Sequence, residues 1–144
     1  MIGDARIELA KAPKGSFDLL AIDAFSSDAI PMHLMTNEAI GVYLDALSER
    51  GYLLIHISNR FIELEPVLAA VAKSRGLAAA IREDNPPAGT EYTPSSWVIV
   101  TRDPARLAEL ARLAPQSPLR PLQKAASRPW TDDHASILPY VQWQ

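Results

Sequence analysis

The chain has no cysteine, and its six glycines are scattered. Without cysteine it can form no disulfide bond, no thiolate zinc site and no cysteine nucleophile. Because the glycines do not cluster, the glycine-rich turn that cradles phosphates in dinucleotide-binding folds is absent. No apolar run approaches the roughly 20 residues of a membrane-spanning helix. These absences argue against a disulfide-stabilised protein, a membrane-spanning protein and an intact nucleotide-binding motif.

Positive and negative charges are nearly balanced. Fourteen Lys and Arg against 17 Asp and Glu give a formal net charge of −3, and the basic residues form no run. This pattern predicts no nucleic-acid partner and no attraction to an anionic membrane. The histidines at 33, 56 and 134 lack metal-ligand spacing, so we predict no metal site. No charged leader precedes an apolar core at the start of the chain, and we expect a cytoplasmic protein.

The order of apolar segments predicts an α/β fold. Apolar runs alternate with segments of helical periodicity, which indicates βαβ units with right-handed crossovers. The expected helices cover 5–12, 37–50, 61–75 and 103–113, and the expected strands cover 17–23, 52–58, 77–82 and 97–101. The continuous apolar run over 17–23 predicts a parallel strand that is covered on both faces. Only a loop joins the last two strands, so we expect a three-layer α/β/α sheet, mostly parallel, whose last strand is antiparallel.

The chain divides at residue 114 into a domain and an arm. Residues 1–114 contain all the expected helices and strands. Five prolines then follow within 115–144, and we interpret this segment as an arm that wraps a surface rather than a second domain. Its aromatic residues Trp130, Tyr140 and Trp143 pack internally or anchor the arm on a partner subunit. Asp132 and Asp133 form a solvated turn or line an amine-binding cleft.

Residues capable of chemistry gather where the first expected strand ends. Asp23 closes this strand, and Ser26, Ser27 and Asp28 follow within five residues. In open α/β sheets, ligands bind beyond the carboxyl ends of the strands. A carboxylate there can hold an ammonium group and accept its proton. In the structural alternative, Asp28 caps a turn and Asp23 only closes the strand. The serines lack the glycine-flanked elbow of a hydrolase nucleophile.

Several segments together resemble the spermidine synthase-like proteins, which are polyamine aminopropyltransferases and their relatives. The segments are Gly3-Asp4-Ala5-Arg6, Phe17-Asp18-Leu19-Leu20, Asp23 to Pro31, His56-Ile57-Ser58-Asn59-Arg60 and the tail Trp130-Thr131-Asp132-Asp133. The resemblance implies the class I methyltransferase fold, a Rossmann-like fold. It also implies transfer of an aminopropyl group from decarboxylated S-adenosylmethionine to an amine.

The resemblance implies a cofactor site at the beginning of the chain. Gly3, Asp4 and Ala5 would belong to it, with Asp4 near the adenine amino group. Capping of the helix over 5–12 is the other interpretation of Asp4. The family's glycine-rich turn is missing, as is the acid that holds the ribose hydroxyls. The chain therefore resembles the C-terminal half of the family fold, with the N-terminal half missing. We expect it to bind no decarboxylated S-adenosylmethionine tightly.

The resemblance also implies catalytic and substrate-binding residues. Asp23 or Asp28 would orient and deprotonate the attacking amine. Asp23 matches by its place at the strand end, and Asp28 matches by following the serine pair. Ser26, Ser27 and His56 would contact the substrate, a polyamine or another amine. His56 stands where the family usually carries a glutamine, and it serves as a base, an amine ligand or a backbone-bonded histidine. The chain alone is expected to be inactive.

The missing half would leave the strand over 17–23 without one neighbour. Such edges recruit other chains, so we expect a homodimer formed through the exposed sheet edge or the C-terminal arm. A fragment of a longer protein and an arm folded over the gap are the other possibilities. Two more functions stay open because fold does not fix function: a non-enzymatic homodimerising interaction module, and an S-adenosylmethionine-dependent methyltransferase relative.

Overall fold

A computed structural model of the protein describes residues 4–23, 31–58 and 62–141. In this part of the chain one sheet is built from β1 (Phe17–Ile22), β2 (Leu47–His56), β3 (Ala78–Asp84), β4 (Ser95–Thr101) and β5 (Arg120–Pro121). The helices are α1 (Ala5–Ala10), α2 (Asn37–Ala46), α3 (Glu65–Arg75) and α4 (Pro104–Leu113), with short 3₁₀ turns η1 (Met32–Leu34) and η2 (Leu138–Tyr140). No described helix has the length and apolar character needed to cross a bilayer.

The strands lie in the order β1-β2-β4-β3-β5. β1 and β2 are parallel, whereas β4 is antiparallel to both of its neighbours, β2 and β3. β1, β2 and β3 therefore point the same way, and the last of the four expected strands runs against them, as predicted. The short strand β5 was not predicted; it pairs antiparallel with β3 at the far edge. The mixed α/β fold expected from the sequence is confirmed.

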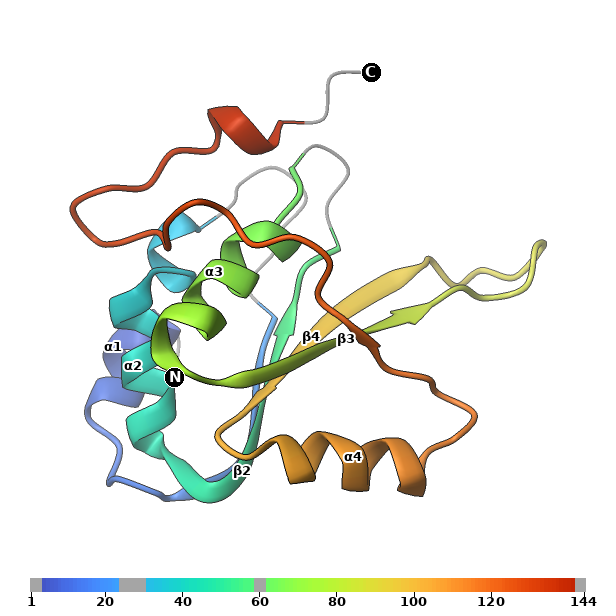
Figure 1. Ribbon diagram of the computed structural model, residues 1–144, viewed down its shortest axis with the longest axis horizontal. Helices are drawn as coiled ribbons and strands as arrows, with labels where there is room; N and C mark the ends of the chain where they lie inside the picture. The colour runs from blue at the N-terminus through green and yellow to red at the C-terminus, as the bar shows by residue number, and fades with distance from the viewer. Residues whose placement is uncertain (1–3, 24–30, 59–61, 142–144) are drawn as a thin grey trace.

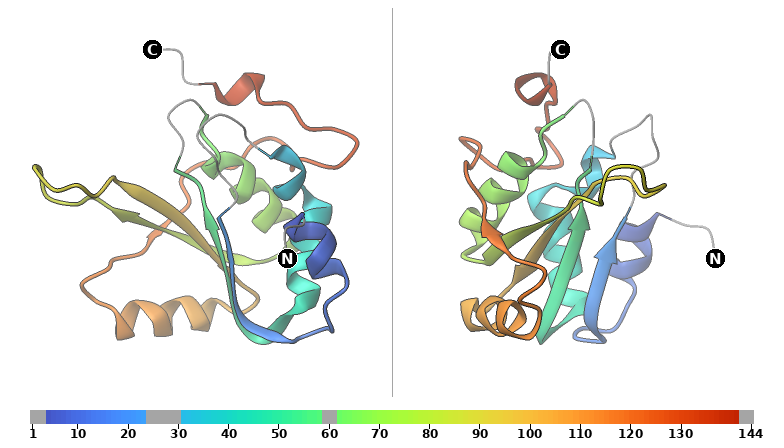
Figure 2. Two further views of the ribbon diagram at one scale, coloured as in Figure 1. Left: turned by 180° about the vertical axis from the view of Figure 1, so that it is seen from behind. Right: turned by 90° about the vertical axis from the view of Figure 1, so that its right-hand side faces the viewer.

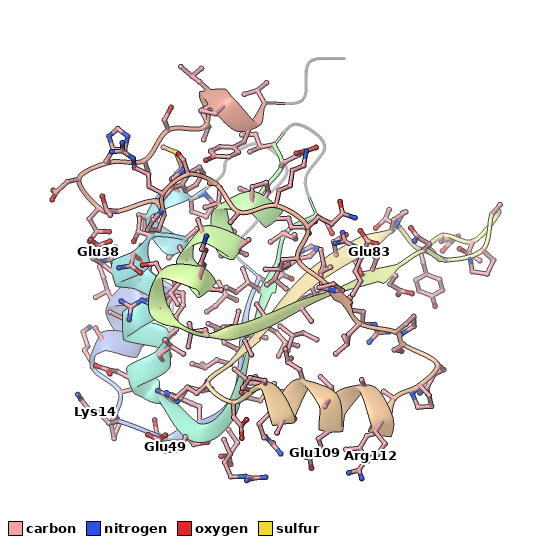
Figure 3. The ribbon with its side chains drawn as sticks, viewed as in Figure 1. Lys14, Glu38, Glu49, Glu83, Glu109 and Arg112 are labelled. Carbon is pink, nitrogen blue, oxygen red and sulfur yellow. The ribbon has the colours of Figure 1, made fainter. Side chains whose placement is uncertain are left out.

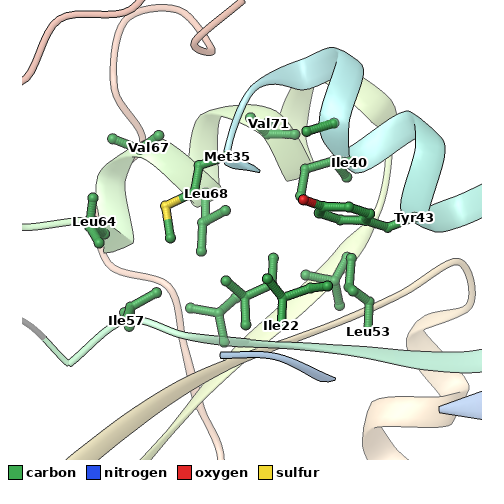
Figure 4. Close-up of a cluster of buried hydrophobic side chains, with 14 of the residues drawn as sticks. Ile22, Met35, Ile40, Tyr43, Leu53, Ile57, Leu64, Val67, Leu68 and Val71 are labelled. Carbon is green, nitrogen blue, oxygen red and sulfur yellow. The ribbon is translucent and has the colours of Figure 1, made fainter. Parts of the chain in front are cut away.

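Helices cover both faces of the sheet (Figure 1). α1, α2 and α3 lie on one face, and α4 lies on the other against β3 and β4. The core fills the space between the sheet and α2 and α3, as Figure 4 shows for Leu53, Tyr43 and Leu68. The apolar faces predicted for these two helices, including Ile40 and Val71, are buried there. These contacts are the main source of hydrophobic stabilisation in the domain.

The expectation that both faces of β1 are covered is wrong. Leu20 and Ile22 are buried against the helices, but Leu19 keeps 60% and Phe17 keeps 39% of its surface exposed. β1 forms one end of the described sheet (Figure 2), and α4 contacts β3 and β4 rather than β1. The side chains on the second face of β1 therefore lack a covering helix among the described residues.

The predicted boundary between α2 and β2 is also wrong. Gly51 was expected to end the helix, but α2 ends at Ala46 and β2 begins at Leu47. Arg102 lies at this end of the helix, and its guanidinium donates to the carbonyl oxygens of Leu44 and Ser48 at 2.5 and 2.9 Å. The last carbonyls of a helix need partners. Here the N–H of Leu47 donates to Tyr43 and Leu44, and Arg102, a side chain from just beyond β4, adds a second donor to Leu44.

Gly51 instead lies at an irregularity in the pairing of β1 with β2. Phe17 pairs with Leu47, yet Leu19 pairs with Tyr52, so two steps along β1 correspond to five along β2. A Cβ on Gly51 would lie 2.6 Å from Cγ of Leu47 and 3.0 Å from the carbonyl oxygen of Asp18. The extra residues of β2 thus fit only because residue 51 has no side chain. Beyond this point the register is regular, and Ile22 lies opposite Ile55.

The segment after α4 runs from β5 back across the helical face (Figure 1). The amide N–H of Ala126 donates to the carbonyl of Pro66 at the start of α3, and that of Asn37 donates to the carbonyl of Trp130. Trp130 is buried in the core and meets Tyr140 edge to face. Trp130 therefore packs internally, which was one of the two predicted alternatives.

Candidate functional site

The carboxyl ends of β1 and β2 bring Asp23 and His56 together. Their register continues from the Ile22–Ile55 pair, and side chains of directly opposed residues share one face of a sheet. Asp23 Oδ1 lies 2.8 Å from His56 Nδ1. The Asp23 carboxylate is largely exposed, whereas the imidazole keeps only 20% of its surface exposed. An accessible carboxylate is thus backed by a partly buried imidazole.

Ser58 and Trp97 complete the surroundings of the imidazole. Ser58 Oγ lies 2.7 Å from His56 Nε2, and it also accepts a hydrogen bond of 2.7 Å from the amide N–H of Ser96. The indole of Trp97, opposite His56 in β4, stacks on the imidazole with ring centroids 4.8 Å apart. We call Asp23, His56, Ser58 and Trp97 the strand-end cluster. It joins a carboxylate, an imidazole and a hydroxyl in one chain of hydrogen bonds.

Such an arrangement is suited to binding a cation and moving a proton. An exposed carboxylate attracts an ammonium group. Imidazole gains or loses a proton near neutral pH, which a lone carboxylate does not. The place of the cluster, at the carboxyl ends of two parallel strands, is where α/β sheets bind ligands.

Asp4 lies in a second group of polar side chains, at the start of α1. Its Oδ1 accepts from the amide N–H of Arg6 at 2.9 Å, which makes Asp4 the N-cap that one interpretation predicted. Its Oδ2 lies 2.7 Å from His33 Nε2, and hydrogen bonding to His33 lowers the pKa of the Asp4 carboxyl. A nucleoside amino group at Asp4 would therefore share the carboxylate with an existing partner.

Arg6 connects this group to the C-terminal arm. Its guanidinium binds both oxygens of Asp132, at 2.7 and 2.5 Å, and also donates to the carbonyl of His33. Thr36 donates to Asp132 Oδ1, and the backbone N–H of Asp132 donates to Glu38, labelled beside the arm in Figure 3. Hydrogen bonds from Arg6 and then Thr36 lower the pKa of Asp132 to about 2. Asp132 thus joins the arm to Arg6 of α1 and to Thr36 at the start of α2, and is more than part of a solvated turn.

The predicted site residues fall into three groups. Asp23 and His56 are in direct contact. Asp4 and Ala5 lie at the start of α1, where Asp4 is the cap. Four predicted residues lie outside the described part of the chain: Gly3, Ser26, Ser27 and Asp28. In residues 4–23, 31–58 and 62–141, no group of three or more His, Asp or Glu side chains could hold a metal ion.

Ser58 and Trp97 had no assigned role in the sequence interpretation. Ser58 follows His56 by two positions, and alternate residues of an extended chain share a face, so the spacing did carry a signal. Trp97 could be placed only by knowing how β4 pairs with β2. The Arg6–Asp132 contact joins positions 126 apart and has no local signal.

Comparison with solved structures identifies a spermidine synthase-like fold. A probable spermidine synthase from Corynebacterium glutamicum ATCC 13032 aligns with 94% of this chain and 55% of its own, at TM-score 0.62 and 13% identity. The spermidine synthase from Thermotoga maritima aligns with 86% of this chain and 42% of its own, at TM-score 0.55 and 16% identity. The chain thus spans about half the length of these proteins. No family profile matches the sequence, and no curated protein does.

Proposed function

We propose that this chain carries the amine-binding side of a spermidine synthase-like site. In the proposed reaction an amine receives an aminopropyl group from decarboxylated S-adenosylmethionine. The contact between Asp23 and His56 at the carboxyl ends of β1 and β2 is the observation that supports this proposal. The spermidine synthase-like fold supports the proposal independently, because aminopropyl transfer needs a group that holds and deprotonates an amine.

The chemistry requires an unprotonated amine. An alkylamine carries a proton in neutral water and has no lone pair with which to attack carbon. Asp23 would hold the ammonium group at the strand end, and the Asp23–His56 pair would take up its proton. The nitrogen lone pair then forms the new C–N bond while the C–S bond of the sulfonium breaks. Asp28, which matches the resemblance by its serine pair, is the alternative carboxylate for this role.

We propose further that the chain does not catalyse the reaction by itself. Group transfer between two substrates depends on holding both in line. The aligned spermidine synthases contain nearly twice as much chain as this sequence, and the sequence has no glycine-rich turn. We therefore expect this chain to bind the amine but not decarboxylated S-adenosylmethionine.

Calorimetry with each ligand tests the proposal. Titration with putrescine should show binding that weakens about tenfold or more in Asp23→Asn, since about 1.4 kcal/mol corresponds to tenfold. Glu91→Gln, which removes an exposed carboxylate in the loop between β3 and β4, is the control for net charge. Asp28→Asn decides between the two carboxylates. Decarboxylated S-adenosylmethionine should show no micromolar affinity. Putrescine binding that neither Asp23→Asn nor Asp28→Asn weakens would disprove the proposed role of this site.

The exposed side of β1 favours a second candidate, a homodimerising interaction module. Among the described strands β1 has β2 as its neighbour on one side only. Phe17 and Leu19 are exposed on it, and an unpaired edge with apolar side chains recruits another strand. A second copy could pair its own β1 antiparallel across a two-fold axis, an arrangement that uses the same surface twice.

Light scattering during size exclusion tests this candidate. A dimer that becomes monomeric in Leu19→Glu indicates the sheet edge. Leu138→Glu changes a leucine of the arm that is also largely exposed, at 72% against 60% for Leu19, so loss of the dimer in that variant indicates the arm instead. A wild-type chain that elutes as a monomer at all concentrations rules the module out.

A further inference from the structure

Four residues on four neighbouring strands form a row across one face of the sheet. His56 of β2 pairs with Trp97 of β4, which in turn pairs with Arg82 of β3. Asp23 continues the register of β1 opposite His56, and the two side chains are in contact. Directly opposed residues of neighbouring strands share a face of the sheet. We call Asp23, His56, Trp97 and Arg82 the cross-strand row.

The cross-strand row faces away from α2 and α3. Residues one position away from it, Ile55, Val98 and Ile81, belong to the core on the side of these helices. Because successive side chains of a strand point to opposite faces, the row lies on the other face. Solvent reaches the row there, since its two end residues are exposed and its two aromatic residues are half-buried.

The two ends of the row carry opposite charges. The Asp23 carboxylate is 59% exposed. Nothing in the part of the chain that the structure describes forms a hydrogen bond or an ion pair with the Arg82 guanidinium. Glu83, the next residue, lies on the opposite face and is bound by Arg120 at 2.9 Å. A guanidinium offers five N–H donors in a fork that fits a carboxylate. Arg82 therefore has donors available for an anionic group of a ligand.

The spacing of the strands sets the separation of these charges. Neighbouring strands lie about 4.8 Å apart, so three spacings separate the Cα atoms of Asp23 and Arg82 by roughly 14 Å. The arginine side chain is long and flexible, so a ligand that joins the two charged groups is shorter than this. The indole of Trp97 lies between them and offers apolar surface to methylene groups. A second ammonium group at the far end would be repelled by Arg82, whereas a carboxylate would be attracted.

We propose that the cross-strand row selects amines that carry a carboxylate at the end remote from the reacting nitrogen, as an ω-amino acid does. The proposal rests on the proposed amine-binding function. Asp23 holds the ammonium group, and Arg82 binds the distant carboxylate. Arg82 takes no part in proton transfer or in formation of the C–N bond, so it is a specificity-determining residue. A linear diamine uses only the Asp23 end of the row.

Calorimetric titration of the complete chain with three ligands of similar length tests the proposal. 6-Aminohexanoate carries the carboxylate, 6-aminohexanamide replaces it with a neutral amide, and 1,5-diaminopentane places a second ammonium group at the far end. We expect 6-aminohexanoate to bind about tenfold more tightly than the other two, because hydrogen bonds between charged groups are worth about that factor in affinity.

Variants of the two ends assign the preference to the row. Arg82→Gln should lower the affinity for 6-aminohexanoate to that for the amide and leave the affinity for the amide unchanged. Arg112→Gln removes an exposed arginine of α4 and changes the net charge equally, so the preference should persist. Asp23→Asn should weaken binding of all three ligands. In nuclear magnetic resonance spectra, the ring signals of His56 and Trp97 should shift on titration with 6-aminohexanoate.

The outcomes separate this proposal from the function on which it rests. Equal affinities of the wild type for the acid and the amide overturn the proposal, as does a preference that survives in Arg82→Gln. In both cases, amine binding that depends on Asp23 or Asp28 leaves the proposed function in place. Binding of 6-aminohexanoate that depends on Arg82 but on neither aspartate would show a simple anion site and reject both. Absence of binding by every amine, putrescine included, also rejects both.

Discussion

Replacement of Gly51 by alanine should destabilise the protein by more than its small volume suggests. The new Cβ would meet Cγ and Cδ1 of Leu47 at 2.6 and 2.7 Å and the carbonyl oxygen of Asp18 at 3.0 Å. Leu47 is fully buried, so its side chain has no open space to enter, and the Asp18 oxygen belongs to the backbone of β1. Overpacking of this kind costs about 1–3 kcal/mol.

Gly76→Ala provides the matched comparison. Gly76 has a φ of +65° at the end of α3, but no atom lies within 4 Å of the place that its Cβ would take, so only the left-handed backbone opposes the substitution. That conformation costs a non-glycine residue about 1 kcal/mol. Gly51 has no positive φ, so the cost at Gly51 comes from contacts alone.

Urea unfolding followed by circular dichroism measures both variants. A loss of about 2 kcal/mol in Gly51→Ala corresponds to a melting temperature about 4–8 °C lower at this chain length. The register past Gly51 places Asp23 opposite His56, so the His56 ring signals should change in Gly51→Ala and stay unchanged in Gly76→Ala. If Gly51→Ala is no less stable than Gly76→Ala, the close approach of β1 and β2 described here is refuted.

Three further substitutions test the fastening of the arm, the core and the end of α2. The pKa of Asp132 is lowered to about 2, so its carboxylate stabilises the fold fully above its ordinary pKa of about 4. The free energy of unfolding should therefore fall as pH drops from about 4 toward 2. Urea titrations over this range should show a smaller fall in Asp132→Asn. Leu53→Ala, at a fully buried position, should lower the free energy of unfolding by about 2–5 kcal/mol in urea. Arg102→Met should cost about 1–3 kcal/mol and speed hydrogen exchange at the end of α2, because the Leu44 carbonyl keeps only the Leu47 N–H as a donor and Ser48 loses the guanidinium. Unchanged exchange in Arg102→Met would mean that water replaces the guanidinium fully.

The parts of the fold that were predicted correctly have local signals. Thr36 caps α2 by accepting from the amide N–H of Ala39, Asp103 caps α4, and Gly76 ends α3 in the left-handed conformation. Each of these residues acts on backbone within a few positions of itself. The apolar periodicity of α2 and α3 is equally local, so the buried faces could be predicted from the sequence.

The parts that were missed depend on residues far apart in the chain. The end of α2 is bound by Arg102, whose guanidinium donates to carbonyls more than 50 positions earlier. The exposure of Leu19 depends on what lies beyond β1, and an apolar run cannot show whether a second helix layer exists. In the candidate site, strand ends indicated Asp23 and His56, but the contact between them depends on the irregularity at Gly51, which no sequence pattern reveals.

The bond between Arg6 and Asp132 has a consequence for biosynthesis. Because the two residues are 126 positions apart, the first helix cannot gain this partner until nearly all of the described chain has left the ribosome. The sheet and its helices use shorter-range contacts and can assemble during translation, as domains generally do. Attachment of the first helix to the arm is therefore a late event, and a polypeptide released before residue 132 would leave that guanidinium without its carboxylate.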